Sequence, residues 1–431
     1  MKATTASERL PRLDSLDLLR GIAILGIFLM NTQDMSMPVL AYYNPITYDP
    51  EQYLNPDTYA GISSLNYAVF NVIHVFADLK FITIFSMLFG AGILLQGERL
   101  QARGISPAAV HYRRMAILLL IGLFHAYVLW YGDVLAGYAV CGMLLFPLRK
   151  LPAPVLLGLG LGFIAVATLY HWADTQNLNN AVVQWLRNGT YRLTGSITGN
   201  DFEFAAYTGH WRQQMQTRFW IALDNQTYSF LDWMFWRCGG SMLFGMGLLR
   251  LRFFHGEWPR RAYLTIAAIG IPLGWYVTQL GVRHNAAQGW FDGAYPDFAG
   301  MEFNYWGSIP AALGYMALVV YAAIQVAGPG AVLLKKLLIP IRAVGRTALS
   351  NYILQSVIGT TLFYGHGFGY FGTFSRAQLL LVVFTVWSFQ LLVSTWWTHR
   401  FQQGPLEGLW HRVVYGLLPS QPATYPSQPV Q

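Results

Sequence analysis

The sequence contains few charged residues. Aspartate, glutamate, lysine and arginine together make up 11% of its 431 residues, whereas an average soluble domain has about 25%. Hydrophobic residues make up 54%, and the mean hydropathy is +0.36. So little charge cannot cover the surface of a soluble protein of this length. The composition therefore excludes a soluble globular domain and predicts that most of the surface faces lipid.

Cysteine is scarce as well, since the chain has only Cys141 and Cys238. Two cysteines inside apolar stretches exclude a framework of disulfides and are interpreted as small packing residues. The chain also lacks a CxxC pair, a phosphate-binding Walker loop, an HExxH zinc motif and a GxSxG nucleophile turn. We therefore expect neither a metal site nor the chemistry of a typical soluble enzyme.

What the chain has in abundance is long apolar stretches, most of them long enough to cross a bilayer as a helix. Ten spans are predicted: Leu18–Ser36, Phe76–Leu95, Tyr112–Tyr131, Val134–Leu148, Val155–Trp172, Phe230–Leu249, Tyr263–Leu280, Tyr305–Ile324, Leu349–Gly367 and Leu379–Trp397. The fold class is accordingly all-α, a polytopic transmembrane helical bundle. No cleavable signal peptide is evident before the first span.

The basic residues between the spans predict the orientation. With the N-terminus inside, 20 of the 28 lysines and arginines fall on the cytoplasmic side, as the positive-inside rule requires. An even number of spans then places both termini in the cytoplasm. The net charge of +8 is explained by this topology and by contact with anionic membrane lipids, so no nucleic-acid partner is expected.

The same pattern gives the domain organisation. Residues 1–16 form a cytoplasmic N-terminal segment and residues 17–415 form the transmembrane domain. Residues 173–229 are too polar to span and are predicted to be an external insertion of amphipathic helices on the outer membrane surface. Residues 416–431, rich in proline, serine and glutamine, form a disordered cytoplasmic tail.

Polar residues inside spans are costly in lipid and are therefore candidates for function. Asn31 and His125 each lie 11 residues beyond an arginine at the inner surface, Arg20 and Arg114 respectively, or about 16 Å along a helix. Asp133 follows at the outer end. Further polar residues enter their spans from outside: His74, Asp78, Lys80 and Arg237. Their convergence on the outer half of the membrane predicts one polar cavity opening outward.

Structural roles are the alternative for each of these residues. His125 can be a hydrogen-bonded packing residue, and Asp78 with Lys80 can be paired charges at the interface. Arg237 can pair with Asp232 or a backbone carbonyl. Asn351 and Gln355, one turn apart in the ninth span, are typical of contacts between helices.

Several blocks of sequence resemble the YeiB-type membrane proteins, which carry domain of unknown function 418. The resemblance extends from about Arg12 to Tyr415. It is carried by five segments: Arg12–Asn31, Lys80–Gly92, Gly122–Leu135, Gly345–Tyr352 with Gln355-Ser356, and Gly404–Glu407.

A more distant resemblance concerns function. Arg12–Asn31 and Ala77-Asp78-Leu79 are similar to segments of the heparan-α-glucosaminide N-acetyltransferases. The resemblance implies transfer of acetyl from acetyl-CoA to a lumenal amino sugar, with an asparagine at Asn31 and a histidine in the loop that follows. Here no histidine precedes His74 after Asn31, so His74 and His125 both remain candidates.

The chemistry of such an enzyme assigns roles to the polar residues. His125 or His74 would act as general base, Asp133 or Asp78 would orient it, and Asn31 would donate to the oxyanion. The phosphates of acyl-CoA would favour basic residues: Arg20, Arg113 and Arg114 at the cytoplasmic mouth, with Arg237 as a further candidate. The alternative for these arginines is that they only mark topology.

The sequence therefore predicts a multi-pass protein of the plasma (inner) membrane that moves an acyl group from a cytoplasmic acyl-CoA to an extracytoplasmic glycan or small-molecule acceptor. The alternative is a transporter or flippase for a small or lipid-linked metabolite, which would use the same cavity for passage. A non-catalytic membrane scaffold is a third hypothesis.

Overall fold

In the computed structural model of the chain, the described residues are 14–48, 50, 61–176, 200–293, 297–326, 331–401 and 403–416. These residues form helices and connecting turns without any strand, which confirms the all-α class. The predicted tail after residue 416, most of the N-terminal segment and the insertion between residues 176 and 200 lie outside the described residues.

Each of the ten predicted spans is a helix in the structure. Within the described residues, seven helical segments are long and apolar enough to cross a membrane: α1 (Asp14–Ser36), α4 with α5 (Ser64–Phe76 and Lys80–Gln101), α6 with a π-helical turn (Pro107–Phe124 and His125–Leu129), α8 (Ala153–Thr175), α13 (Arg260–Ala287), α14 (Phe298–Val326) and α17 (Arg376–Arg400). The other three are shorter: α7 (Leu135–Leu145), α12 (Phe235–Arg250) and α16 (Ala348–Phe363). The chain is thus a multi-pass membrane protein, and a count of ten spans remains a prediction.

The remaining helices were not predicted as spans. They are α2 (Leu40–Tyr43), α10 (Asn200–Thr208), α11 (Trp211–Gln226), α15 (Val332–Arg346) and α18 (Pro405–Tyr415), together with short π and 3₁₀ turns at Phe230–Met234, Phe146–Lys150, Phe253–His255 and Gly289–Gly293.

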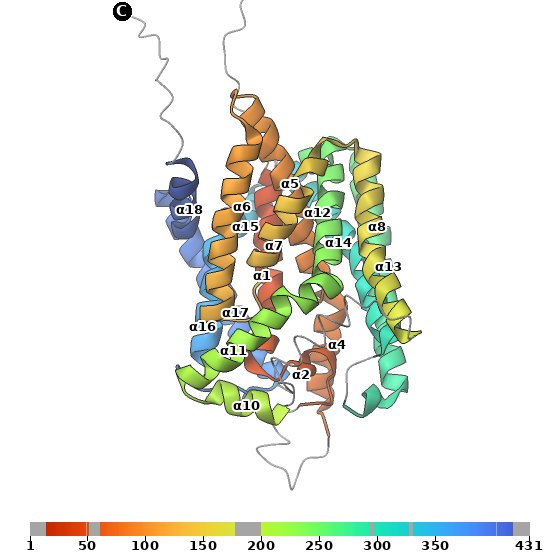
Figure 1. Ribbon diagram of the computed structural model, residues 1–431. Helices are drawn as coiled ribbons and strands as arrows, with labels where there is room; N and C mark the ends of the chain where they lie inside the picture. Colours follow the sequence, from red (N-terminus) through yellow and green to blue (C-terminus); the bar gives the residue numbers. More distant parts are fainter. Residues whose placement is uncertain are drawn as a thin grey trace, which may run out of the picture.

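The helices form one bundle with α1 near its middle (Figure 1). In that view α8 and α13 lie along one edge, and α6, α16 and α18 lie along the other. Close packing in the interior depends on small residues. A Cβ atom on Gly90 of α5 would lie 2.0 Å from the carbonyl oxygen of Met242, and one on Gly245 of α12 would lie 1.9 Å from that of Met87. Glycine at both positions therefore lets the backbones of α5 and α12 touch, as small residues do between membrane helices.

The two ends of the bundle differ. α18 and the turn that joins α5 to α6 lie at one end, and α2, α10 and α11 lie across the other (Figure 1). The helices α10 and α11 of the predicted insertion and the C-terminal α18 therefore lie at opposite ends of the bundle. α11 is more than a surface helix, however, because four of its own residues are buried against the bundle: Gln214, Thr217, Arg218 and Ala222.

Two interruptions in apolar runs position polar groups. Between α4 and α5 the backbone of Leu79 is left-handed, with φ of 60°, which turns the chain at Asp78. At the end of α6 the helix widens into the π-helical turn His125–Leu129 before Trp130 becomes extended. Such π turns often occur at functional sites, and this one carries His125.

Candidate functional site

His125 and Asp133 come together because the chain reverses between α6 and α7. The π-helical turn ends at Leu129, and Asp133 lies just before the first residue of α7. The reversal carries the Asp133 side chain back to the histidine. His125 Nδ1 lies 2.8 Å from Asp133 Oδ2, and Asp133 Oδ1 accepts a 2.8 Å hydrogen bond from the backbone N–H of Ala136. The carboxylate is therefore fixed at both oxygens, and the first turn of α7 holds it in place.

The other ring nitrogen of His125 meets a residue from a distant part of the chain. His125 Nε2 lies 2.8 Å from Ser356 Oγ on α16. His125, Asp133 and Ser356 are exposed by only 0%, 9% and 1%, so the three side chains form one buried chain of hydrogen bonds. The rings of Trp130 and Tyr352 enclose the imidazole, with centroids at 6.3 and 5.0 Å.

This arrangement determines what each group can do. A carboxylate can only accept hydrogen bonds, so Asp133 selects the tautomer of His125 that carries its proton on Nδ1. Nε2 is then an acceptor, and the Ser356 hydroxyl donates to it. A hydroxyl whose proton points at a basic imidazole, which is itself oriented by a carboxylate, is the geometry of an activated nucleophile.

The pairing of His125 with Asp133 was a sequence prediction, whereas the role of Ser356 was missed. The sequence draws attention to Ser356 only because the Gln355-Ser356 pair belongs to one of the segments that resemble the family. A helical serine usually bonds the carbonyl four residues earlier, and Ser356 Oγ is 3.5 Å from Tyr352 O as well. No local signal in the sequence distinguishes it from other helical serines.

Asp78 belongs to a second buried network, centred on Asn304 of α14. Asp78 Oδ2 accepts a 2.8 Å hydrogen bond from Asn304 Nδ2, and Asp78 Oδ1 accepts one of 2.5 Å from the Tyr42 hydroxyl. Lys80 Nζ donates to Asn304 Oδ1 at 2.6 Å and to Thr278 Oγ1 at 3.2 Å. Asp78 and Lys80 are exposed by 4% and 0%, so both charges are enclosed by the bundle.

His74 lies at the edge of this second network. Its Nδ1 is 3.1 Å from Asp78 Oδ2, which is close enough for an ion pair. The two atoms are not aligned for a hydrogen bond. Its backbone carbonyl accepts a hydrogen bond from Lys80 Nζ at 3.1 Å. His74 therefore lies beside a carboxylate but, unlike His125, has no hydroxyl group of the described residues bonded to its ring.

Arg237 is a structural residue by its contacts. It donates to the carbonyl of Tyr305 at 2.6 Å, to Thr83 at 2.7 Å and to Ser308 at 2.5 Å, so it ties α12 to α5 and α14. The alternative of a backbone carbonyl partner is confirmed. Asp232, the other suggested partner, lies 3.2 Å from His171 instead.

Asn31 lies two turns beyond Ile24 of α1, which belongs to the same buried cluster as Tyr352 of α16. The side chain of Asn31 is half-buried. One turn further on, Asp34 accepts a hydrogen bond from the Tyr131 hydroxyl at 3.2 Å. Among the described residues, no hydrogen bond joins Asn31 itself to His125. Asn351 and Gln355 make contacts between helices, as expected, through Ser394 and Gln390 of α17.

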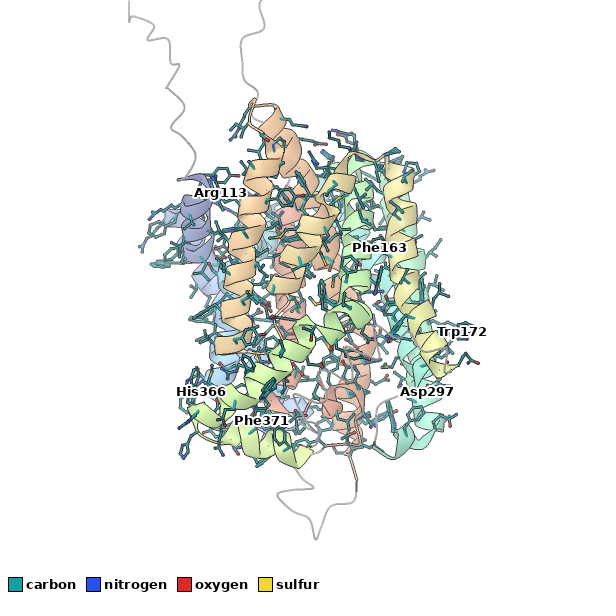
Figure 2. The ribbon with its side chains drawn as sticks, viewed as in Figure 1. Arg113, Phe163, Trp172, Asp297, His366 and Phe371 are labelled. Atoms are coloured by element: carbon teal, nitrogen blue, oxygen red, sulfur yellow. The ribbon has the colours of Figure 1, made fainter. Side chains whose placement is uncertain are left out.

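The predicted donor-side arginines lie at the opposite end and contact α18. Arg113 donates to the carbonyl of Val414 at 3.1 Å, and Arg114 stacks over Trp410 at 4.6 Å. In Figure 2 Arg113 lies at that end of the bundle. Arg20 forms an ion pair of 3.3 Å with Asp17.

α18 is fixed to the bundle by Glu407 of the Gly404–Glu407 segment. Glu407 Oε1 accepts from the backbone N–H groups of Leu349 and Ser350 at 2.7 and 3.1 Å, and its Oε2 accepts from the Ser350 hydroxyl. A carboxylate at these unpaired amides caps the N-terminus of α16, the helix that carries Ser356.

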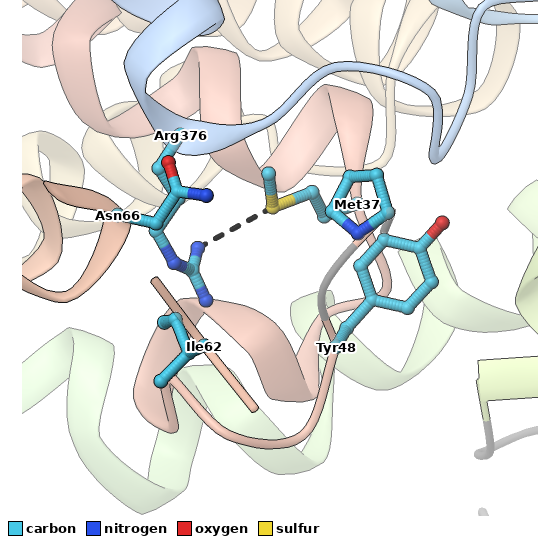
Figure 3. Close-up of a pocket in the computed structure, with 6 residues that line it drawn as sticks. Met37, Tyr48, Ile62, Asn66 and Arg376 are labelled. Carbon is cyan, nitrogen blue, oxygen red and sulfur yellow. Dashed lines mark hydrogen bonds between the residues drawn. The ribbon is translucent and has the colours of Figure 1, made fainter. Parts of the chain in front are cut away.

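A small pocket lies elsewhere, where the chain leaves α1 (Figure 3). It is lined by Met37, Tyr48, Pro50, Ile62, Asn66 and Arg376. Arg376 donates to the sulfur of Met37 at 3.3 Å and to the carbonyl of Ala41 at 2.9 Å, so it holds the segment after α1 against α17. None of the predicted site residues lines this pocket. Over the described part of the chain, histidine, cysteine and carboxylate side chains form no cluster that could hold a metal ion.

Comparison with known proteins identifies relatives over nearly the whole chain. A family described as "Protein of unknown function (DUF418)" matches residues 248–417. The "Uncharacterized protein YeiB" of Escherichia coli (strain K12) is 29% identical over 420 residues, which cover 93% of this chain and 95% of that protein. The "Uncharacterized protein YxaH" of Bacillus subtilis (strain 168) is 25% identical over 412 residues, 94% of each chain.

Proposed function

The chain belongs to the YeiB family of membrane proteins, and we propose that it is an integral membrane acyltransferase whose reaction centre is the chain of hydrogen bonds Asp133–His125–Ser356. The acyl donor is a cytoplasmic acyl-CoA, and the acceptor is a hydroxyl or amine of an extracytoplasmic glycan or small molecule. The observation that carries the proposal is the Ser356 hydroxyl held against His125 Nε2 at 2.8 Å.

The reaction has two steps. As Ser356 Oγ attacks the thioester carbonyl, its proton passes to His125 Nε2. The C–S bond then breaks, and the leaving CoA sulfur takes that proton, which leaves an acyl ester on Ser356. The acceptor next attacks the ester carbonyl and gives its own proton to His125 Nε2. The C–Oγ bond breaks, and the proton returns to Ser356.

Asp133 stabilises the imidazolium that forms in both steps. Because His125 and Asp133 are buried, the interaction of their charges is not weakened by water. Two cations, Arg113 and Arg114, lie beside α18, at the end of the bundle where we place the cytoplasm (Figure 2). Positive charge at this end favours an anionic ligand, and the phosphates of CoA are such a ligand. Asn31 of α1, a helix that packs against α16, is the candidate oxyanion donor.

The orientation of the bundle in the membrane determines from which side each substrate enters. We place α18 and the α5–α6 turn in the cytoplasm and α10 and α11 outside the plasma (inner) membrane, as the distribution of lysine and arginine predicts. The enzyme is favoured over a transporter or flippase because passage of a metabolite does not require a serine hydroxyl aligned with a histidine and a carboxylate.

Mass spectrometry of the purified protein after incubation with acetyl-CoA tests the proposal. An acetyl group on Ser356 is expected, and none should form on Ser356→Ala. His125→Ala should form it at a rate lower by roughly 10²–10⁴-fold. If Ser356→Ala transfers acyl groups at the wild-type rate, Ser356 is not the nucleophile. Wild-type turnover in His125→Ala would remove the proposed reaction centre altogether.

A further inference from the structure

A group of buried hydrogen-bond donors lies under α11, next to the reaction centre but not part of it. Arg218 of α11 is 0% exposed, and its Nε and NH2 atoms have no hydrogen-bond partner. The hydroxyls of Tyr207 and Tyr364 and the indole Nε1 of Trp130 are also buried without a partner. Leaving buried donors unsatisfied destabilises a fold, so five unsatisfied atoms in one region require an explanation.

Ring contacts show that these residues form one cluster. Tyr207 and Tyr364 stack with their centroids 4.5 Å apart, and the guanidinium of Arg218 lies 5.8 Å from the Tyr364 ring. Tyr131 links Tyr207 to Trp130, with a centroid separation of 5.9 Å to each. In Figure 2 Phe371, which packs on Tyr207, lies beside α10 and α11 at the end of the bundle far from Arg113. We call Trp130, Tyr207, Arg218 and Tyr364 the outer donor cluster.

The structural contacts of Arg218 explain only part of its side chain. Its NH1 donates to the carbonyl of Val128 at the end of the π-helical turn, and its guanidinium also lies over Trp211 at 5.3 Å. These contacts do not use Nε or NH2. Among the described residues no carboxylate forms an ion pair with Arg218. A buried charge without a counter-ion is expensive.

The nearby carboxylates are engaged elsewhere. Glu203 accepts from the backbone N–H of Val39 at 2.9 Å, and Asp34 accepts from Tyr131. Burial raises the pKa of Glu203 to about 7, so near neutral pH this carboxyl is partly protonated and repels an anion less than a full charge would. The unsatisfied atoms are thus donors, with a positive charge among them. The ligand they suit must supply acceptors and negative charge.

We propose that the outer donor cluster binds the carboxylate or phosphate group of an anionic acceptor, with Arg218 as counter-ion and the hydroxyls of Tyr207 and Tyr364 as further donors. That this ligand is the acceptor rests on the proposed acyl transfer; the anion site itself does not. Trp130 connects the two sites, because its ring also contacts His125. Tyr364 lies eight residues beyond Ser356 along α16, or about 12 Å at 1.5 Å per residue. An acceptor anchored at the cluster must therefore extend past Trp130 to reach Ser356, and α11, which covers the cluster, must move to admit it.

Thermal unfolding of the purified full-length protein tests the anion site without any acyl donor. The probes are inorganic phosphate, glucuronate and glucose, the last of which shares the ring hydroxyls of glucuronate but lacks its charge. Phosphate or glucuronate should raise Tm and glucose should not. The anion with the larger effect identifies the source of the charge. No rise with either anion, or an equal rise with glucose, overturns the proposal.

Variants separate binding from folding. Arg218→Gln should abolish the rise in Tm, whereas Arg212→Gln, an exposed arginine on the same helix, should retain it. Tyr207→Phe and Tyr364→Phe remove hydroxyls that have no protein partner, so they should not lower the Tm of the free protein. Each should weaken anion affinity by roughly 10- to 100-fold, the size of a lost hydrogen bond to a charged group. Wild-type affinity in both tyrosine variants contradicts the assignment.

The same measurements distinguish this site from the proposed function. His125→Ala and Ser356→Ala should bind the anion as the wild type does while failing in acyl transfer. Anion binding in a protein that transfers no acyl group would leave the site standing and reject the function. Acyl transfer by a protein that binds no anion would reject only the site.

Discussion

Ser356 Oγ lies 2.8 Å from His125 Nε2, although 231 residues separate the two in the chain. This contact joins α16 to the end of α6 and gives the buried histidine a hydroxyl on one nitrogen and a carboxylate on the other. In the second network His74 also lies near a carboxylate, that of Asp78. The hydrogen bonds continue from Asp78 to Asn304 and from Asn304 to Lys80. The hydrogen-bonding partners of the two histidines therefore distinguish them.

His125→Ala should lower the turnover of acyl transfer by roughly 10²–10⁴-fold with nearly unchanged binding of acyl-CoA, because a general base acts on the chemical step. His74→Ala is the matched control and should retain most of the turnover, since no hydroxyl lies on its ring. Steady-state kinetics on folded, membrane-inserted protein checks both. Loss confined to His74→Ala would move the base to the second network.

Asp133→Asn should also lower turnover, by up to ~10⁴-fold, because an amide can donate to Nδ1 and so favour the wrong tautomer of His125. Asp78→Asn serves as the comparison. It should lower Tm through its loss of charge beside buried Lys80, but leave the turnover of the folded fraction nearly intact. Equal turnover in Asp133→Asn and wild type would remove Asp133 from the mechanism.

Arg113 and Arg114 have two competing roles, which a double change to Gln separates. If they bind CoA phosphates, the variant should bind acyl-CoA more weakly by roughly tenfold or more. If they only hold α18, protease should cut α18 more readily while acyl-CoA affinity stays unchanged. Limited proteolysis and equilibrium binding on the same inserted protein give the two readouts. Arg412→Gln, an exposed arginine on α18, is the control.

Glu203 should make stability depend on pH. Burial raises its pKa from 4.5 to about 7, so between these values the folded protein holds a proton that the unfolded chain releases. Its contribution to stability is therefore fully present below pH 4.5 and is lost as pH rises to about 7 and above, by at most about 3 kcal/mol. Glu203→Gln keeps an acceptor for the Val39 N–H and should flatten this part of the Tm curve. The same fall in Tm in both proteins would assign the dependence to another group.

The orientation of the bundle predicts which surface positions a membrane-impermeant thiol reagent can reach. The two native cysteines are buried. A cysteine at the exposed Arg212 of α11 should react in intact cells, whereas one at the exposed Arg103 of the α5–α6 turn should react only after lysis. The opposite result would invert the topology and put the outer donor cluster in the cytoplasm.

The sequence by itself determined the class of the protein and most of its helices. Long apolar segments are excluded from water, and backbone N–H and C=O groups in lipid must form hydrogen bonds with each other. These two facts predict a helical bundle without any tertiary information. The same reasoning singled out His125 and Asp133, because a polar ring in an apolar run needs a partner and Asp133 lies only eight residues away.

Only the tertiary structure decided which polar groups meet. The sequence predicted one outer cavity for His125, Asp133, Asp78 and Lys80, but hydrogen bonds divide these residues into two networks. The division depends on how α14 and α16 are rotated in the bundle. Asn304 is hydrogen-bonded to Asp78, 226 residues away in the sequence, and Ser356 is hydrogen-bonded to His125, 231 residues away. Such rotations are set by the packing of whole helix faces, including glycines such as Gly90 against α12. No pattern within a single span contains that information.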